Sequence, residues 1–263
     1  MLKVKNPLFE HPERLETLRK GVYIVPNLVT TGSLFAGFYG IVATINGDYR
    51  TASWFILVSG IFDALDGKVA RLTGTTSRFG IEYDSLADLV AFGVAPALLI
   101  YNWALRPYGK IGWLAAFLYV VCGALRLARF NVQVHFVESR RFVGLPIPAA
   151  ASTLSSCVLL VYYLGGSGTV KMVSVLILIY LLAFLMISNF PYVSFKDPEL
   201  LKRRPFSFLV LAIVAIIVIV ARPEIFVFTI FVVYMLSAPI LYVARFLYWR
   251  RKPTLFGNDK KSG

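Results

Sequence analysis

Four aspartates lie close together in a stretch that is otherwise apolar. Asp63 and Asp66 are three residues apart, and Asp84 and Asp88 are four apart. Residues at these separations share one face of a helix, so each pair would present two carboxylates to the same side. An ionised Asp inside a membrane costs about 2.5 to 3.5 kcal/mol even on the lenient insertion scale. The four carboxylates therefore need compensating charge.

Two such faces turned toward each other would place four carboxylates around one small volume. Their mutual repulsion would oppose ionisation unless cations occupied the space between them. Every ligand would be an oxygen atom, and the stretch contains no His or Cys. The simplest occupants are therefore one or two hard divalent ions, Mg²⁺ or Mn²⁺.

Glycine and arginine continue the helix face on which Asp63 lies. Gly67 follows Asp63 by four residues and removes a side chain where a bulky group could approach the backbone. Arg71 follows by four more, and its guanidinium could hold a phosphate through a forked, charge-assisted contact. The hydroxyl-rich turn 73–77 offers donors to phosphate or sugar oxygens. The stretch therefore favours a phosphate ligand over a bare ion site.

Two other interpretations compete with this one. The aspartates could be structural ion-pair partners of Lys68, Arg71 or Arg78, but four of them at paired helical spacing favour a site. A cation transporter or channel would continue the polar path toward the far side of the membrane. Residues 57–62 and 89–92 contain no further acidic side chain. A one-sided site fits an enzyme better.

The composition indicates a polytopic membrane protein. Hydrophobic residues make up 58% of the 263 residues and charged residues only 16%, with a mean hydropathy of +0.71. The net charge of +13 is not gathered in one tail or stripe, because the basic residues fall in short clusters between apolar runs. We interpret them as topology signals and expect no nucleic-acid partner.

The apolar runs predict about eight transmembrane helices, since each run is near the roughly 20 residues needed to cross a bilayer. Breakers such as Asn46-Gly47-Asp48 and Arg222-Pro223 separate most of them. The runs cover residues 25–46, 51–72, 81–105, 111–133, 147–164, 170–190, 206–221 and 224–247.

The basic residues predict the orientation of these helices. Eight crossings with a cytoplasmic start leave all but five of the 27 Lys and Arg on the cytoplasmic side, in accord with the positive-inside rule. Both termini and the aspartates would then face the cytoplasm. Segment 1–21 would be either an interfacial helix or a solvated basic tail, and 248–263 a basic tail. The five exceptions are Arg50, Arg106, Lys110, Lys171 and Arg222.

The motif Asp63-x2-Asp66-Gly67-x2-Ala70-Arg71-x8-Gly80-x3-Asp84-x3-Asp88 resembles the signature of the CDP-alcohol phosphatidyltransferase family at every fixed position. The resemblance implies an all-α membrane protein with a six-helix catalytic core, here 22–190, followed by two additional helices in 191–247. It implies two bound divalent metal ions and transfer of a phosphatidyl group from CDP-diacylglycerol to an alcohol, with release of CMP. A homodimer in the cell (inner) membrane is also expected.

The resemblance assigns roles to individual residues. The four aspartates would be metal ligands, and Asp88 would also be the general base. Gly67, Arg71 and the hydroxyl of Ser77 would contact the CDP group. The start of the first core helix, residues 26–30, would line the nucleotide pocket through Asn27 and Thr30.

The acceptor alcohol must be recognised outside this motif. Arg126 and Arg129 are three residues apart, share a helix face and could grip a carboxylate, or they could simply anchor the helix at the membrane surface. Their segment and residues 141–148 are similar to the corresponding region of the family's membrane-embedded phosphatidylserine synthases. L-serine is therefore the expected acceptor, with glycerol 3-phosphate or an inositol phosphate as alternatives. The last two helices carry no acidic pair and are interpreted as scaffold, lipid contact or dimer surface.

Overall fold

The protein is described by a computed structural model, which covers residues 12–73, 77–134, 142–166, 169, 171–192 and 221–251. Nearly all of these residues are helical, which confirms the all-α prediction. The helices are α1 (Pro12–Ile45), α2 (Tyr49–Thr73), α3 (Arg78–Asp88), η2 (Leu89–Val94), α4 (Ala95–Ile100), η3 (Tyr101–Leu105), η4 (Arg106–Tyr108), α5 (Lys110–Val134), α6 (Ile147–Tyr163), α7 (Val173–Ile187) and α10 (Pro223–Arg251). Two short strands, β1 (Phe142–Val143) and β2 (Pro191–Tyr192), complete the described elements.

Within the described residues, four helical segments are long and apolar enough to cross a membrane, namely Pro26–Ile45, Arg78–Tyr108, Lys110–Val132 and Pro223–Ala244. Two shorter apolar helices, α6 and α7, accompany them. Helix α2 has 25 residues but carries the charged residues of the motif. The prediction of a polytopic membrane protein is confirmed, while the predicted run 206–221 lies almost entirely outside the described residues.

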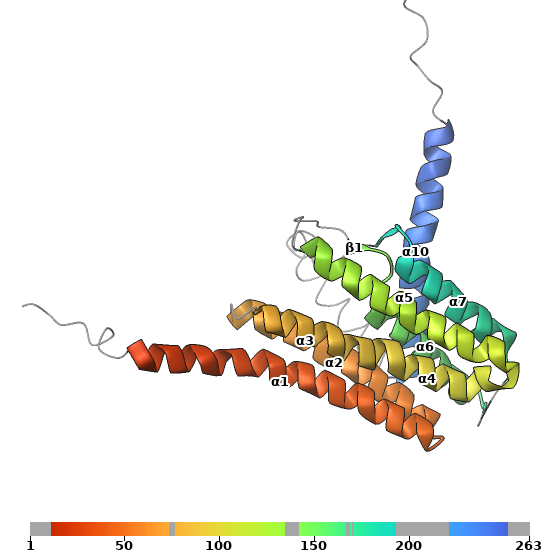
Figure 1. The fold of residues 1–263 in the computed structure, drawn as a ribbon. Helices are drawn as coiled ribbons and strands as arrows, with labels where there is room; N and C mark the ends of the chain where they lie inside the picture. The colour runs from red at the N-terminus through yellow and green to blue at the C-terminus, as the bar shows by residue number, and fades with distance from the viewer. Residues whose placement is uncertain are drawn as a thin grey trace, which may run out of the picture.

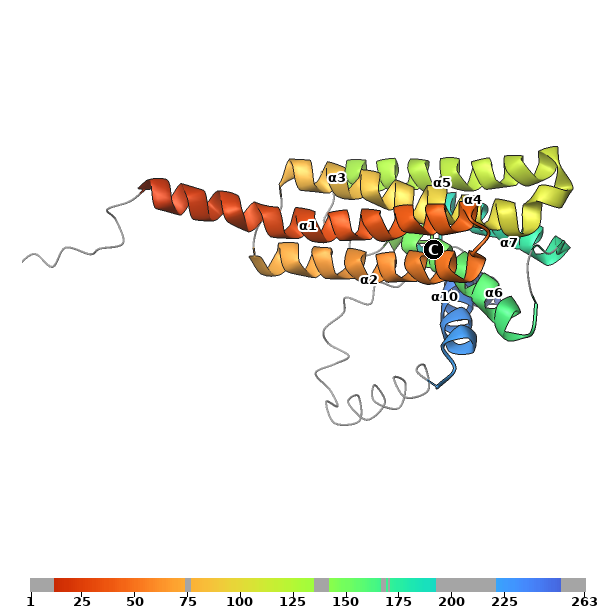
Figure 2. The ribbon, with the colours of Figure 1, turned by 90° about the horizontal axis from the view of Figure 1, so that it is seen from below.

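The first six predicted helices form one bundle in the described part of the chain, and α10 lies apart from them. Helix α1 packs along α2, α5 along α7, and α6 against both α2 and α10 (Figures 1 and 2). Helix α10 crosses the bundle steeply (Figure 1). Helix α1 already begins at Pro12, so residues 12–21 and the first predicted span belong to one continuous helix.

Small residues allow α1 to approach its neighbours closely. The hydroxyls of Ser33 and Ser59 lie 2.8 Å apart across the interface between α1 and α2. A Cβ added to Gly37 would lie 2.6 Å from the Cα of Ala91, so a side chain at this position would collide with the backbone of η2. Small residues at helix contacts are typical of membrane bundles. They bring the helices that carry the aspartates into contact with α1.

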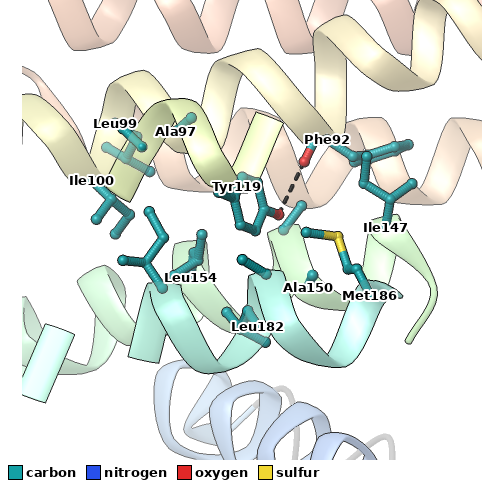
Figure 3. Packing of buried hydrophobic residues seen from close by; sticks show 14 of the residues in the cluster. Phe92, Ala97, Leu99, Ile100, Tyr119, Ile147, Ala150, Leu154, Leu182 and Met186 are labelled. Carbon is teal, nitrogen blue, oxygen red and sulfur yellow. Dashed lines mark hydrogen bonds between the residues drawn. The ribbon is translucent and has the colours of Figure 1, made fainter. Parts of the chain in front are cut away.

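The predicted helix 81–105 is observed as one irregular helical segment, Arg78–Tyr108. It contains two π-helical stretches, and the first begins directly after Asp88. Pro96 has no N–H to offer the carbonyl of Phe92, four residues earlier. The buried hydroxyl of Tyr119 on α5 donates to that carbonyl over 3.1 Å (Figure 3). The hydrogen bond compensates for the proline inside the apolar core.

The core lies between the irregular segment and helices α5, α6 and α7. Leu99, Leu154 and Leu182 are buried there with Phe92 and Tyr119 (Figure 3). This packing fixes the helix that follows Asp88 against the rest of the bundle, so the position of Asp88 depends on a rigid support.

A short antiparallel pair links the segment before α6 to the end of α7. Phe142 pairs with Tyr192, and Val143 pairs with Pro191. Gly144 has φ +84°, and an added Cβ would lie 2.4 Å from the carbonyl oxygen of Met186. Glycine is the residue that adopts this conformation without strain and leaves room for the close contact. Residues 142–148 are thereby held at the end of α7.

Candidate active site

Three of the four predicted aspartates meet at one point. Carboxylate oxygens of Asp63 and Asp66 on α2 and of Asp84 on α3 all lie within 4.8 Å of one another. Asp66 is only 5% exposed. The donors are hard oxygens from two rigid helices, so this arrangement fits a divalent cation such as Mg²⁺ or Mn²⁺. The predicted convergence of the two helix faces is present for these three residues.

Asp88 lies one helical turn after Asp84 and is 9% exposed. It stands outside the group of three carboxylates but interacts electrostatically with each of them. It also interacts with the guanidinium of Arg126. Asp88 therefore experiences both the negative charge of the cluster and the positive charge of a buried guanidinium.

Thr30 contacts this cluster directly. Its hydroxyl, buried on α1, lies 2.9 Å from Oδ2 of Asp66 and donates to it, with the carbonyl of Pro26 also 3.1 Å away. The resemblance placed Thr30 in the nucleotide pocket. The structure shows that its hydroxyl holds the carboxylate of a predicted metal ligand, and such hydrogen bonds commonly orient metal-binding carboxylates.

Asn27 and Ser77, the other two side chains predicted to contact the nucleotide, lie close to each other. Oγ of Ser77 accepts a hydrogen bond of 2.9 Å from the N–H of Gly80 and caps the start of α3. A Cβ added to Gly80 would lie 3.1 Å from Oγ of Ser77 and 3.4 Å from Oδ1 of Asn27. Glycine at this motif position thus leaves space between two polar groups. The Ser77 hydroxyl proton remains available to donate.

The stripe predicted on α2 has the expected helical spacing. Asp63, Gly67 and Arg71 all lie within α2, at intervals of four residues. Gly67 is partly buried. The side chain of Arg71 lies outside the described residues, so only its backbone position in the last turns of the helix is established.

The two arginines predicted to bind the acceptor point to different places. Arg126 is 8% exposed and interacts electrostatically with Asp88 and Asp63. Among the described residues its Nε has no hydrogen-bond partner. Arg129 instead donates to the carbonyl of Ile187 over 3.3 Å and to Oδ1 of Asn189 over 2.8 Å. Arg126 faces the aspartates, whereas Arg129 ties α5 to the end of α7.

A hydrogen-bonded side-chain pair that the sequence did not predict joins α5 to α3. The amide of Asn131 donates to Oγ of Ser85 over 3.0 Å. Ser85 lies between Asp84 and Asp88 in the sequence but turns to the α5 side. No motif signals this contact, because it depends on how the two helices pack. The hydrogen bond fixes the position of α3 along α5, and with it the position of the aspartates of α3 relative to Arg126.

An apolar cavity of about 920 Å³ opens beside Asp63, between α2, α6 and α10. Its walls include Leu57 and Ile61 from α2, Pro148 from α6, and Ile230 from α10. Tyr234 of α10 also lines it, although the last helix carried no predicted site residue. The carboxylate cluster thus adjoins a space suited to hydrocarbon chains.

The chain is similar to several characterised proteins. A CDP-diacylglycerol--serine O-phosphatidyltransferase from Helicobacter pylori (strain ATCC 700392 / 26695) is 44% identical over 178 residues, which are 66% of this chain and 74% of the relative. An archaetidylserine synthase from Methanothermobacter thermautotrophicus is 40% identical over 170 residues, 64% of this chain and 69% of the relative. A CDP-diacylglycerol--serine O-phosphatidyltransferase from Methanocaldococcus jannaschii is 44% identical over 143 residues, 54% of this chain and 63% of the relative.

The CDP-alcohol phosphatidyltransferase family model matches residues 23–193, which include every aspartate of the cluster as well as Thr30, Ser77 and Arg126. The match also spans the strand pair that holds the segment before α6. Since it covers well over half of the 263 residues, the chain belongs to the CDP-alcohol phosphatidyltransferase family.

Proposed function

We propose that this protein transfers the phosphatidyl group of CDP-diacylglycerol to the hydroxyl of L-serine, giving phosphatidylserine and CMP. The observation that carries the proposal is the convergence of Asp63, Asp66 and Asp84 beside Asp88 and the buried Arg126. The names of the serine phosphatidyltransferase relatives support the choice of donor and acceptor.

The reaction is a displacement at phosphorus. The serine hydroxyl oxygen attacks the β-phosphorus of the donor, and the bond from this phosphorus to the oxygen that bridges to CMP breaks. CMP leaves with the bonding electron pair. Asp88 takes the proton of the attacking hydroxyl as general base. Its interaction with both the carboxylate cluster and Arg126 suits this role.

Asp63, Asp66, Asp84 and Asp88 would hold two divalent ions, Mg²⁺ or Mn²⁺. Such ions would offset the charge of the pyrophosphate and of the departing CMP. The chain itself contributes the orientation of the ligands. Thr30 fixes one carboxylate oxygen of Asp66, and the Asn131–Ser85 contact fixes the α3 turn between Asp84 and Asp88.

The donor would bind across the polar and apolar parts of the site. Asn27, Thr30 and Ser77 would face the nucleotide, while Gly67 leaves space for the phosphates and Arg71 pairs with them. The acyl chains would enter the apolar cavity next to Asp63. The β-phosphorus would then lie at the boundary between the two environments, beside the carboxylates.

The acceptor carboxylate would meet Arg126. A buried guanidinium with an unsatisfied Nε costs free energy until an anion reaches it, so it favours an acceptor that carries a carboxylate. Arg129, through its bonds to the end of α7, would support the acceptor pocket from outside. Glycerol 3-phosphate and inositol phosphates remain the alternative acceptors and would need a second phosphate pocket.

The charge asymmetry supports a site and termini that face the cytoplasm, in the cell (inner) membrane. The exposed apolar face of α5, with Trp113, Leu114 and Phe117, would be available for lipid or for a second copy in a homodimer. Chemical cross-linking in membranes would test the dimer independently of activity.

The experiment that tests this function is CMP release by the purified protein with CDP-diacylglycerol, Mg²⁺ or Mn²⁺, and a panel of alcohols. We expect release with L-serine, and a loss of about 100-fold to 10,000-fold in Asp88→Asn. Glu82→Gln, an exposed position on the same helix, is the matched control and should keep wild-type activity. Release with another alcohol alone would retain the family reaction and overturn the assignment of serine.

A further inference from the structure

The apolar cavity beside the carboxylate cluster extends along α2 away from Asp63. Its lining on this helix begins at Trp54 and ends at Ala64, which is about three helical turns. Trp54 precedes Asp63 by nine residues, and at the rise of an α-helix this corresponds to about 14 Å. One leaflet supplies half of the roughly 30 Å hydrocarbon core of a bilayer, or about 15 Å. The cavity is therefore about as long as the space that one acyl chain occupies in its own leaflet.

The cavity ends where the starts of α2 and α10 approach each other. Trp54 of α2 and Val227 of α10 are the lining residues nearest to these starts. About one turn beyond them, Nη2 of Arg50 lies 3.9 Å from Oε1 of Glu224, so an ion pair joins the two helices. Trp54 is half-buried and has the largest side chain of the lining. Its indole therefore lies at the closed end of the cavity, with the ion pair behind it.

The long side of the cavity opens toward the membrane. Ile61 of α2 and Val233 of α10 both line the cavity, and each side chain is more than half exposed. Helix α10 forms this wall although it lies outside the family match of residues 23–193. The hydroxyl of Tyr192, a buried residue of β2, donates to the carbonyl of Met235 over 2.9 Å and holds α10 in place. A lipid can therefore enter sideways between two fixed helices.

We propose that Trp54 is a specificity-determining residue, whose indole limits the length of the donor acyl chain that the cavity accepts. The inference rests on the proposed function, in which the head group of CDP-diacylglycerol lies at the carboxylates. A chain that starts beside Asp63 and runs along α2 meets the indole at the closed end. Shorter chains fit inside the cavity, whereas longer chains must bend out through its open side. A filled hydrophobic pocket discriminates against one extra methylene by about 10-fold or more.

The test measures kcat/KM of the full-length protein for CDP-diacylglycerols that differ only in chain length, from dioctanoyl to distearoyl, in mixed micelles. Trp54→Ala opens the end of the cavity and should raise the ratio of long-chain to short-chain kcat/KM by about 10-fold. Leu57→Trp places an indole about one turn closer to Asp63 and should lower the same ratio by a similar factor. Phe55→Ala is the matched control and should keep the wild-type ratio, because the Phe55 ring packs on Tyr39 and does not line the cavity.

Shifts in opposite directions for Trp54→Ala and Leu57→Trp support the inference, because a general loss of stability would lower kcat/KM alike for every chain length. If Leu57→Trp does not fold, the comparison of Trp54→Ala with Phe55→Ala decides alone. An unchanged ratio in Trp54→Ala, or the same shift in Phe55→Ala, overturns the inference and leaves the proposed function standing. A wild-type protein that releases no CMP from CDP-diacylglycerol of any chain length overturns the proposed function, and this inference with it.

Discussion

The hydroxyl of Thr30 on α1 donates to Oδ2 of Asp66 on α2 over 2.9 Å, and both side chains are buried. The hydrogen bond joins the helix predicted to line the nucleotide pocket to one that carries predicted metal ligands. The hydrogen bond therefore restricts the orientation of a carboxylate that belongs to the cluster with Asp63 and Asp84.

Removing this hydroxyl should weaken metal binding. We expect Thr30→Val to raise the Mg²⁺ or Mn²⁺ concentration for half-maximal CMP release by about 10-fold to 100-fold. Thr30→Ser should stay near wild type because it keeps the donor. The measurement is a metal titration at saturating CDP-diacylglycerol, which separates metal affinity from a direct nucleotide contact.

The control for this titration is Thr44→Val, near the other end of α1, where a buried hydroxyl donates to the carbonyl of Gly40. It should leave the metal dependence unchanged. A Thr30→Val protein with the wild-type metal curve and a raised KM for CDP-diacylglycerol would show that Thr30 serves the nucleotide alone.

The contact between Gly37 and Ala91 should make position 37 intolerant of any side chain. Gly37→Ala places a Cβ 2.6 Å from a backbone atom of η2, so the helices must shift. Such overpacking costs about 1 to 3 kcal/mol. We expect thermal unfolding in detergent several degrees below that of wild type. Gly60→Ala, where the nearest atom would lie 3.9 Å away, is the matched control. Equal melting temperatures for the two variants would contradict the packing argument.

The spacing of the aspartates predicted the convergence of Asp63, Asp66 and Asp84, because residues that share a helix face follow from helical periodicity. Asp88, which was predicted to join them, lies outside this group of three. The apolar runs likewise predicted the helices that the structure describes. The different interactions of Arg126 and Arg129 could not be predicted, because the two residues share one face of α5. Arg129 bonds to Asn189 after the end of α7, whereas Arg126 interacts with Asp88.

The position of Tyr234 in the wall of the apolar cavity could not be predicted from the sequence either. Tyrosine is common in apolar helices. Tyr234 lines the same cavity as Asp63 because α10 crosses the bundle steeply (Figure 1). The π-helical stretches after Asp88 depend in the same way on tertiary contacts. Pro96 signals an irregularity in the sequence, but the donor that compensates for it, Tyr119, comes from another helix.

Tyr119→Phe should destabilise the fold and leave the chemistry in place. The variant removes the donor to the carbonyl of Phe92, whose usual helical partner is missing at Pro96. An unsatisfied buried carbonyl costs about 1 to 3 kcal/mol, so the melting temperature should fall. Tyr180→Phe, at a partly exposed position on α7, serves as the control and should melt like wild type. Unchanged stability in Tyr119→Phe would mean that the π-helical backbone satisfies the carbonyl by itself.

Asp48 should make stability depend on pH at the opposite end of the bundle from the site. It caps the start of α2, where its Oδ1 accepts from the N–H of Thr51 over 3.0 Å. Hydrogen bonds from the Thr51 side chain and then from its N–H lower the pKa of Asp48. Because the pKa is lower in the folded state, the carboxylate stabilises the fold above its unfolded pKa. That contribution is lost as the pH falls below about 4.

Asp48→Asn keeps a capping side chain but cannot titrate, so it should lack this acid-dependent loss. Asp48→Ala removes the cap and should cost about 1 kcal/mol at pH 7. The measurement is thermal unfolding in detergent from pH 7 to pH 3 for the three proteins. Because Asp48 is largely solvated, the difference between wild type and Asp48→Asn should be small and should shrink in high salt. Parallel pH curves for these two proteins would show that the cap acts through its geometry and not through its charge.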